Sequence, residues 1–367
     1  MRSATALARR RLDKPADPPV RLMIVDDSEV ARAVLSRMVS AHGEFTLAAT
    51  AGNAQDALEA LRTVTVDIIL LDIEMPGASG LEALPDIIRA GQGARVLIVS
   101  SMAEHGAETT LKALAQGAAD VLPKPGIGNF AGRFADILAE RLRRLGRAER
   151  EEAARPARVP APPLQLRDMP DGALGCVAMG ASTGGLVALF DFLRALPPIG
   201  APILVTQHLP SLFMPHFARQ LEAASDRVAR VAAEGETLRP DEIHVAPGDA
   251  HLCVARHAGE VRVRLDRKPA SSGCLPSADP MLASVAAAYG RDGVGVMLSG
   301  MGRDGLMGSR RLVECGGAVL AQDKASAAIW GMPRVVAEAG LACAVLAPAD
   351  LARKVAQRAA AGVSAWN

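Results

Sequence analysis

Three residue types that can perform nucleophilic catalysis each follow an apolar segment of this sequence. Ser182 lies in the glycine-rich stretch 180–185, which matches the pattern G-x-S-x-G. His208 ends the apolar stretch 201–208, and Asp304 lies in the glycine turn after a later apolar stretch. A serine hydroxyl needs a base to become a nucleophile, and the base needs an orienting carboxylate. The three residues therefore predict nucleophilic acyl chemistry, provided that the fold brings them together.

Strands of a parallel sheet would bring them together. An apolar run that stops at glycines and resumes with helical spacing predicts a strand, a tight turn and a helix. Helical stretches separate the three apolar runs, so the sheet is expected to be parallel. Ligands bind such sheets in the crevice outside the carboxyl ends of the strands, where all three side chains are expected. Glycines permit the sharp turn, and the free N–H groups of the next helix can receive an oxyanion.

Each of these residues also has a structural alternative. Ser182 and Asp304 could cap the helices that follow them, and His208 could be a buried core histidine. The other histidines are weaker candidates, because they are expected on a helix (His216), in a hairpin turn (His257), within a strand (His244) and in a structural position near the crevice (His251). The chain order Ser, His, Asp differs from the Ser, acid, His order of an ordinary α/β-hydrolase, which disfavours that fold.

A second group of charged residues is expected in the first third of the chain. Asp26 and Asp27 close its first predicted strand, Asp72 closes the third, and Ser100 and Lys124 follow the fourth and fifth. Three carboxylates at one sheet edge repel one another unless a hard cation bridges them, so a Mg²⁺ site is predicted. A lysine and a hydroxyl beside it could meet a phosphoryl group. A helix cap and a simple turn are the alternative explanations.

Strands and helices alternate along both halves of the sequence. The first half predicts strands at 20–26, 45–49, 66–72, 94–100 and 119–122, with helices that include 29–40, 108–116 and 129–145. The second half predicts strands near Leu174, Ile203, Val228, Ile243, Val294 and Ala318, and a β-hairpin at about 251–265 that is added to the sheet. We therefore expect two doubly wound α/β domains. The predicted divisions are a flexible tail (1–19), a five-stranded parallel domain (20–145), a Pro-rich linker (146–171) and a mostly parallel catalytic domain (172–367).

Composition narrows the possible functions and compartments. With 41 basic and 40 acidic residues, the chain carries no electrostatic footprint for nucleic acid or a membrane surface. No apolar run reaches the length of about 18 residues that spans a bilayer, so we expect a cytoplasmic protein without membrane insertion. The five cysteines are scattered and never spaced as C-x-x-C, which predicts a reducing compartment and no zinc site.

Residues 20–145 resemble a response-regulator receiver domain. The motifs that carry the resemblance are Val25-Asp26-Asp27-Ser28, Leu70-Leu71-Asp72-Ile73-Glu74-Met75-Pro76-Gly77, Val99-Ser100-Ser101 and Lys124-Pro125. The resemblance implies that Asp72 accepts a phosphoryl group from a histidine kinase. The implied Mg²⁺ ligands are the side chains of Asp26, Asp27 and Asp72 with the main-chain carbonyl of Glu74.

The same resemblance implies that Ser100 and Lys124 contact the phosphoryl oxygens. One position departs from the family pattern, because Val121 stands where many receivers have Tyr or Phe. In those receivers the aromatic side chain swings on activation, so the relay of the phosphorylation signal is expected to differ here.

The second half of the chain resembles the CheB family of protein-glutamate methylesterases of bacterial chemotaxis. The motifs are Gly180-Ala181-Ser182-Thr183-Gly184-Gly185, Thr206-Gln207-His208-Leu209-Pro210, the stretch 243–249, the stretch 298–305, Ala321-Gln322-Asp323 and Gly331-Met332-Pro333. The resemblance implies hydrolysis of glutamyl methyl esters on chemoreceptors with release of methanol, and in many members deamidation of receptor glutamines. It implies no cofactor for catalysis, with Mg²⁺ serving the receiver.

Carried over by motif, Ser182 is the nucleophile, His208 the general base and then acid, and Asp304 the residue that orients the imidazole. Backbone N–H groups near Thr183 and Met301 are candidates for oxyanion stabilisation. Leu275, which stands where relatives often have Arg, removes a possible contact to a substrate carboxylate or to the receiver.

The family resemblance also implies control of one domain by the other. In the family, the unphosphorylated receiver packs across the catalytic crevice, and phosphorylation loosens that contact. Two other functions stay open: an inactive hydrolase-like module that binds receptors and competes for kinase phosphate, and an esterase that acts on small metabolites.

Overall fold

The computed structural model describes residues 18–75, 80–100, 104–124, 131–153 and 164–364. Nearly all of the predicted tail, and several quoted motif positions (Pro76, Gly77, Ser101 and Pro125), lie outside these ranges. No helix among the described residues is both long enough and apolar enough to cross a bilayer.

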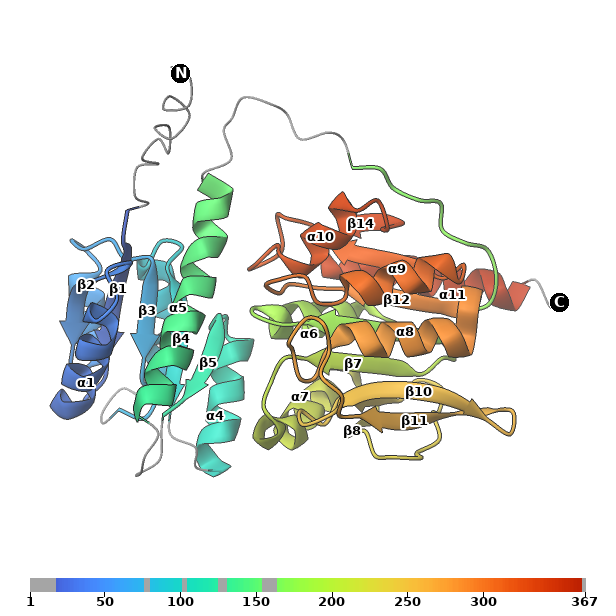
Figure 1. Ribbon diagram of the computed structural model, residues 1–367, viewed down its shortest axis with the longest axis horizontal. Coiled ribbons are helices and arrows are strands. Elements are labelled where there is room, and N and C mark those ends of the chain that lie inside the picture. The colour runs from blue at the N-terminus through green and yellow to red at the C-terminus, as the bar shows by residue number, and fades with distance from the viewer. Residues whose placement is uncertain (1–17, 76–79, 101–103, 125–130, 154–163, 365–367) are drawn as a thin grey trace, which may run out of the picture.

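The first unit is a five-stranded parallel sheet covered by helices (Figure 1). Its elements are β1 (Val20–Val25), α1 (Glu29–Ser40), β2 (Phe45–Ala51), α2 (Ala54–Ala60), β3 (Ile68–Leu71), α3 (Gly80–Ala90), β4 (Arg95–Ser100), α4 (Glu104–Ala115), β5 (Asp120–Pro123) and α5 (Ala131–Ala153). The strand order is β2-β1-β3-β4-β5, and every pairing is parallel. Strand β3 is buried along its whole length, as expected for a sheet covered on both faces. This arrangement confirms the predicted receiver-like fold.

Helix α5 differs from its expected extent. It begins at Ala131 and runs to Ala153, well beyond the expected end at residue 145 and into the stretch predicted as linker. The added segment consists mainly of Arg, Glu and Ala, which favour the helix, and the first proline comes only at Pro156.

The second unit is built on a seven-stranded sheet. Its elements are β6 (Cys176–Ala181), α6 (Gly185–Ala195), β7 (Ile203–Gln207), η1 (Ser211–Phe213), α7 (Met214–Ser225), β8 (Ala229–Val231), β9 (Ile243–Val245), β10 (His251–His257), β11 (Glu260–Asp266), α8 (Ala278–Tyr289), η2 (Gly290–Asp292), β12 (Gly293–Met297), α9 (Leu306–Glu314), β13 (Ala318–Gln322), α10 (Met332–Glu338), β14 (Ala344–Leu346) and α11 (Pro348–Ser364). The order is β14-β13-β12-β6-β7-β9-β8, with parallel pairings throughout. Strand β14 is only three residues long and was not anticipated.

The predicted hairpin is present as β10 and β11. It forms a two-stranded antiparallel sheet of its own and does not extend the seven-stranded sheet. Its buried residues Leu252, Val254 and Val263 pack with α8, so the hairpin covers one side of the domain.

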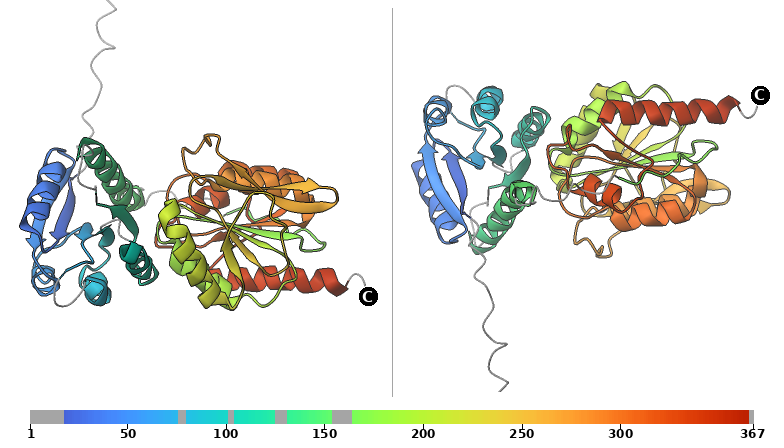
Figure 2. Two further views of the ribbon diagram at one scale, coloured as in Figure 1. Left: turned by 90° about the horizontal axis from the view of Figure 1, so that it is seen from below. Right: turned by 90° about the horizontal axis from the view of Figure 1, so that it is seen from above.

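Alternate residues of the central strands point to opposite faces of the large sheet. Val177 and Met179 pack in the cluster that contains residues of α6, α7 and α11, whereas Cys176 and Ala178 pack in the cluster that contains residues of α8, α9 and α10. The two layers of helices lie on opposite sides of the sheet (Figure 2). This is the predicted doubly wound architecture.

The two units contact each other through the side of the first that carries α4, β5 and α5 (Figure 1). Helix α4 lies against η1, α6 and α7. The N–H of Gly184 donates to the Ala119 carbonyl at 3.1 Å, and the guanidinium of Arg95 donates to the Ala328 carbonyl at 2.8 Å. Ile329 is buried in the same apolar cluster as residues of α5. The first unit therefore sits against the edge of the second sheet where the candidate residues are found.

Candidate active site

The three predicted residues lie at the carboxyl ends of three adjacent strands. Ser182 follows β6, His208 follows β7, and Asp304 lies in the loop between β12 and α9. These strands are neighbours in the order β12-β6-β7. The side chains therefore meet although Ser182 and Asp304 are far apart in the sequence.

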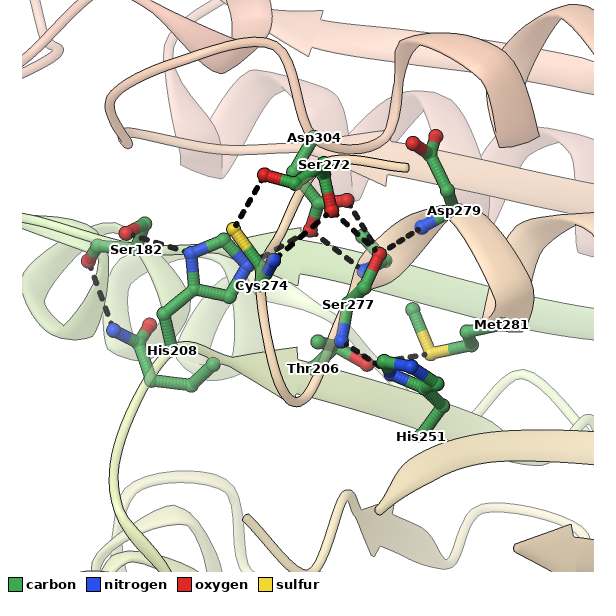
Figure 3. A network of polar contacts seen from close by, with 12 residues as sticks. Ser182, Thr206, His208, His251, Ser272, Cys274, Ser277, Asp279, Met281 and Asp304 are labelled. Carbon is green, nitrogen blue, oxygen red and sulfur yellow. Dashed lines mark hydrogen bonds and ion pairs between the residues drawn. The ribbon is translucent and has the colours of Figure 1, made fainter. Parts of the chain in front are cut away.

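The three side chains form a continuous hydrogen-bonded chain (Figure 3). Ser182 Oγ lies 3.0 Å from His208 Nδ1, and His208 Nε2 lies 2.8 Å from Asp304 Oδ2. An ionised carboxylate only accepts, so in the neutral ring Nε2 carries the proton and the lone pair of Nδ1 faces the hydroxyl. In the familiar Ser-His-Asp arrangement Nε2 faces the serine. Here the two ring nitrogens exchange these roles, and either nitrogen of a neutral imidazole can accept a proton.

The backbone around Ser182 is held by both neighbouring strands. Its N–H donates to the Ser299 carbonyl at 2.9 Å, and its carbonyl accepts from the Gln207 side-chain amide at 2.9 Å. A Cβ at Gly300 would lie 2.8 Å from the Ser182 Cβ, so only glycine lets this segment pass beside Ser182. The N-cap of α6 is Gly184 at φ +69°, without a side-chain cap. Ser182 is thus not the cap of the helix that follows it.

Asp304 is held by the start of α8. Its Oδ1 accepts from the Ser277 hydroxyl at 2.6 Å, and its Oδ2 accepts from the Ala278 N–H at 2.7 Å. Burial alone would raise the pKa of Asp304, but the hydrogen bonds from His208, Ser277 and Ala278 lower it to about 2. The positive end of the helix dipole acts in the same direction. The carboxylate therefore stays charged beside His208. Sequence reasoning missed Ser277, because nothing in its local pattern points to Asp304.

The same carboxylate shifts the titration of the histidine. Burial alone would lower the pKa of His208, but its hydrogen bond to Asp304 and the nearby Cys274 side chain raise it to about 9. The imidazole is therefore expected to hold a proton on both nitrogens at neutral pH in the closed arrangement seen here. It can act as a base only after it loses one of them.

A pH dependence of hydrolysis follows from that shift. Because the neutral imidazole is the active form, kcat/KM is expected to rise about tenfold per pH unit at lower pH and to level off above about pH 9. Initial rates on a methyl-ester peptide between about pH 6 and about pH 10, corrected for uncatalysed hydrolysis, measure this profile. A rate that is constant above neutral pH contradicts the expectation.

His251 has the structural position expected for it. Its Nδ1 accepts from the Ser277 N–H at 2.9 Å, and its Nε2 faces the Lys268 carbonyl at 2.8 Å. The buried ring thus fixes the residue that holds Asp304. Of the other histidines, His244 is buried in β9 and His216 contacts Arg219 on α7, so neither reaches the site.

Two main-chain donors remain available beside Ser182. Within the part of the chain that the structure describes, the N–H groups of Thr183 and Met301 donate no hydrogen bond. Thr183 follows Ser182 directly, and Met301 follows Gly300, whose Cα lies against Ser182. Their role as an oxyanion hole stays a prediction.

A cavity of about 1060 Å³ opens between the two units next to Asp304. Six basic side chains contribute to its lining: Arg95, Arg143, Arg144, Arg303, Lys324 and Arg334. Glu140, Asp279 and Asp304 are the acidic groups there. The lining therefore favours an anionic ligand or an acidic peptide. Leu275 is half exposed, and its predicted effect on substrate preference is not tested by this geometry.

The second predicted group also converges, at the carboxyl edge of the first sheet. Asp26 and Asp72 are buried, and Lys124 Nζ lies 2.8 Å from the former and 2.7 Å from the latter. Carboxylate oxygens of Asp26, Asp27 and Asp72 all lie within 4.8 Å of one another. The buried Ser100 hydroxyl has no hydrogen-bond partner among the described residues. Hard oxygen ligands suit Mg²⁺, and an unpartnered hydroxyl beside a lysine suits a phosphoryl group.

The pKa of Asp72 depends on both burial and Lys124. Burial raises the pKa of Asp72, which the hydrogen bond from Lys124 opposes. The N–H of Glu74 donates to Asp72 at 3.1 Å, while the metal-binding role of its carbonyl stays a prediction. Val121 is buried in β5, the strand nearest the second unit.

Comparisons with known proteins agree with both halves of the chain. The CheB methylesterase family model matches residues 177–355, and the response regulator receiver domain model matches residues 22–129. The chain is 37% identical to protein-glutamate methylesterase/protein-glutamine glutaminase 1 of Paramagnetospirillum magneticum, over 94% of this chain and 98% of that protein. It is 42% identical to the corresponding protein 2 of Caulobacter vibrioides, over 93% of this chain and 99% of that protein. Among solved structures it is similar to the Thermotoga maritima CheB methylesterase catalytic domain, with 34% identity, a TM-score of 0.49, and coverage of 50% of this chain and 98% of that one.

Proposed function

This chain belongs to the CheB methylesterase family, as its motifs predicted, and on that premise we propose that it removes methyl esters from glutamate side chains of chemoreceptors. It deamidates receptor glutamines at the same site. The single observation that carries the proposal is the hydrogen-bonded chain from Ser182 through His208 to Asp304.

Acylation uses only groups of this chain and the ester. His208 Nδ1 takes the proton of the Ser182 hydroxyl as Oγ attacks the ester carbonyl. The negative charge that develops on the carbonyl oxygen is received by the N–H groups of Thr183 and Met301. The imidazolium then gives its proton to the departing methoxide, which leaves as methanol. Asp304 remains ionised and stabilises the imidazolium throughout.

Deacylation repeats these steps with water in place of the hydroxyl. His208 takes a proton from water, hydroxide attacks the glutamyl-serine ester, and Ser182 leaves with the returned proton. A primary amide passes through the same tetrahedral oxyanion, and ammonia leaves where methanol left. One site therefore serves both reactions, and the amide is the slower substrate because its leaving group is poorer.

Methanol release from methylated receptor membranes tests the proposal. An esterase for small metabolites would hydrolyse free methyl esters as fast as receptor esters. An inactive binding module would release no methanol from either substrate. The proposed enzyme releases methanol from receptors at a rate well above that from small esters.

The receiver supplies the regulation. Asp72 attacks the phosphorus of a phosphohistidine in a histidine kinase, so that a carboxylate–phosphorus bond forms as the phosphorus–nitrogen bond breaks. Asp26, Asp27 and Asp72, with the Glu74 carbonyl, would hold Mg²⁺, which shields the charge of the incoming phosphoryl group when it is bound. Lys124 and Ser100 bind the phosphoryl oxygens. The partners are thus chemoreceptors and a chemotaxis histidine kinase, and the place of action is the cytoplasm.

Inhibition by the unphosphorylated receiver is supported by where it sits. The contact between Ala119 and Gly184 reaches the turn that carries Ser182, and α5 side chains line the cavity beside Asp304. Phosphorylation opens the site only as far as the phosphoryl group favours the open state energetically.

Replacing Asp72 by alanine is expected to abolish stimulation by a small phosphodonor and to leave the rate of the unphosphorylated wild type. Stimulation is lost because the variant lacks the carboxylate that accepts the phosphoryl group. The rate without phosphodonor is kept because Asp72 lies in a different domain from the triad. Methanol release with and without phosphodonor measures the effect, and Asp86→Ala, an exposed position on α3, is the matched control. Stimulation that survives in Asp72→Ala contradicts the coupling.

A further inference from the structure

A third side chain stands beside the catalytic pair. The Sγ of Cys274, a ring nitrogen of His208 and a carboxylate oxygen of Asp304 all lie within 4.8 Å of one another (Figure 3). Cys274 is partly exposed in the loop between β11 and α8. The expectation of no zinc site rested on the spacing of cysteines in the sequence. These three ligands come from three separate segments, so no local spacing could indicate them.

From this cluster we propose that His208, Cys274 and Asp304 form an inhibitory zinc site in the esterase. Thiolate, imidazole and carboxylate are the three side-chain ligands that Zn²⁺ takes in proteins, whereas Mg²⁺ prefers oxygen ligands alone. Three protein ligands leave the fourth tetrahedral position to water. The proposal deepens the regulation of the proposed active site, and its inhibitory part rests on the proposed esterase activity.

The ligand atoms lie up to 4.8 Å apart and would have to move closer together to share one ion. Zn²⁺ binds these ligands at about 2.0 to 2.3 Å, so ligand atoms in a tetrahedral site lie about 3.2 to 3.7 Å apart. His208 Nε2 and Asp304 Oδ2 are now at the hydrogen-bond distance of 2.8 Å, and the ion would replace the proton between them. Gly273, next to Cys274, has φ +71° and nothing within 4 Å of the position of a Cβ, so no neighbouring atom packs against the loop at this residue.

The surroundings of the cluster suit a metal site. Ser277 and the Ala278 N–H hold the Asp304 carboxylate in place, and such hydrogen bonds to a ligand strengthen metal binding. Both Cys274 and Asp304 line the cavity between the two units, which gives an ion a path from solvent. The arginines of that cavity oppose a dication, so we expect reversible binding and not a permanent structural ion.

Binding would remove the base without any redox step. The Cys274 thiol loses its proton to solvent as the Zn–S bond forms. The proton on His208 Nε2 is displaced, and the neutral ring keeps one proton on Nδ1. Nδ1 then donates toward Ser182 Oγ and no longer offers a lone pair. The serine hydroxyl is left without a base, so hydrolysis stops while zinc is bound.

Zinc titrations of the full-length chain test the proposal, with Mg²⁺ present to occupy the receiver carboxylates. Each variant's methanol release is compared with its own rate before zinc is added. The zinc concentration for half-inhibition is expected to rise at least about tenfold in Cys274→Ala and in Cys274→Ser. Cys315→Ala, a partly exposed cysteine outside the cluster, is expected to match the wild type.

Binding is measured independently of activity. Calorimetry with zinc alone is expected to show one more site per chain in the wild type than in Cys274→Ala, and Co²⁺ is expected to give a thiolate charge-transfer band that Cys274→Ser lacks. Ser182→Ala, although inactive, is expected to bind zinc, which separates this site from the proposed function. Equal zinc sensitivity of Cys274→Ala and Cys315→Ala, or a cobalt complex without a thiolate band, overturns the proposal.

Discussion

Ser182→Ala is expected to lower methanol release from methylated receptors by about 10⁴-fold to 10⁶-fold, the range found when a triad nucleophile is removed. The loss is large because the Ser182 hydroxyl is hydrogen-bonded to His208 Nδ1, and the acyl-enzyme cannot form without this hydroxyl. The small residual rate comes from the oxyanion donors and from substrate binding. Gas-phase or enzymatic detection of methanol measures the change directly.

A serine outside the site provides the control for this variant. Ser225 lies at the end of α7, where its hydroxyl donates to the Leu221 carbonyl at 2.7 Å. Ser225→Ala removes the same atom and is expected to keep the wild-type rate. A Ser182→Ala protein that stays folded and retains more than about a tenth of the wild-type activity contradicts nucleophilic catalysis by this residue.

Asp304→Asn is expected to lower kcat by about 10³-fold to 10⁴-fold with little change in stability. The Ala278 N–H and His208 Nε2–H both donate to the same carboxylate oxygen, so the amide oxygen of asparagine must take that position. The amide nitrogen then faces Ser277 Oγ, which can accept once the Ser277 hydroxyl turns to donate to Ser272 Oγ. The ring keeps its orientation, and what is lost is the charge that stabilises the imidazolium.

Loss of the Asp304 charge is also expected to change the pH profile of activity. Without the charge of Asp304, the pKa of His208 is expected to fall, so the rise of activity with pH moves to lower pH. Asp86→Asn, at an exposed position on α3, is the matched control and is expected to leave both the rate and the pH profile unchanged. An Asp304→Asn protein with wild-type kcat, or with an unmoved pH profile, contradicts the role given to the carboxylate.

The sequence predicted those parts of the site that depend on strand ends. Ser182, His208 and Asp304 each follow an apolar run, and parallel strands must place their carboxyl ends at one edge. The same reasoning found Asp26, Asp72, Ser100 and Lys124. Their roles in chemistry stay predictions, because a distance alone does not show a reaction.

The parts that sequence reasoning missed depend on contacts between distant segments. Ser277 and Ala278 bind Asp304 through the start of α8, and Cys274 reaches the imidazole from an irregular loop. None of these contacts leaves a periodic signal. The hairpin was recognised, but its separation from the large sheet depends on packing against α8. Strand β14 is too short to show a pattern.

The hydrogen bond from Gly184 to the Ala119 carbonyl has a consequence for how the receiver restrains the enzyme. A receiver that only blocked access to the active site would exclude receptor proteins but still admit small esters. Here the receiver also accepts a hydrogen bond from the main chain two residues beyond Ser182, at the start of α6. If the receiver inhibits the esterase as proposed, this contact acts on the turn that carries Ser182 as well as on access, so an ester small enough to pass the receiver is still expected to be hydrolysed slowly.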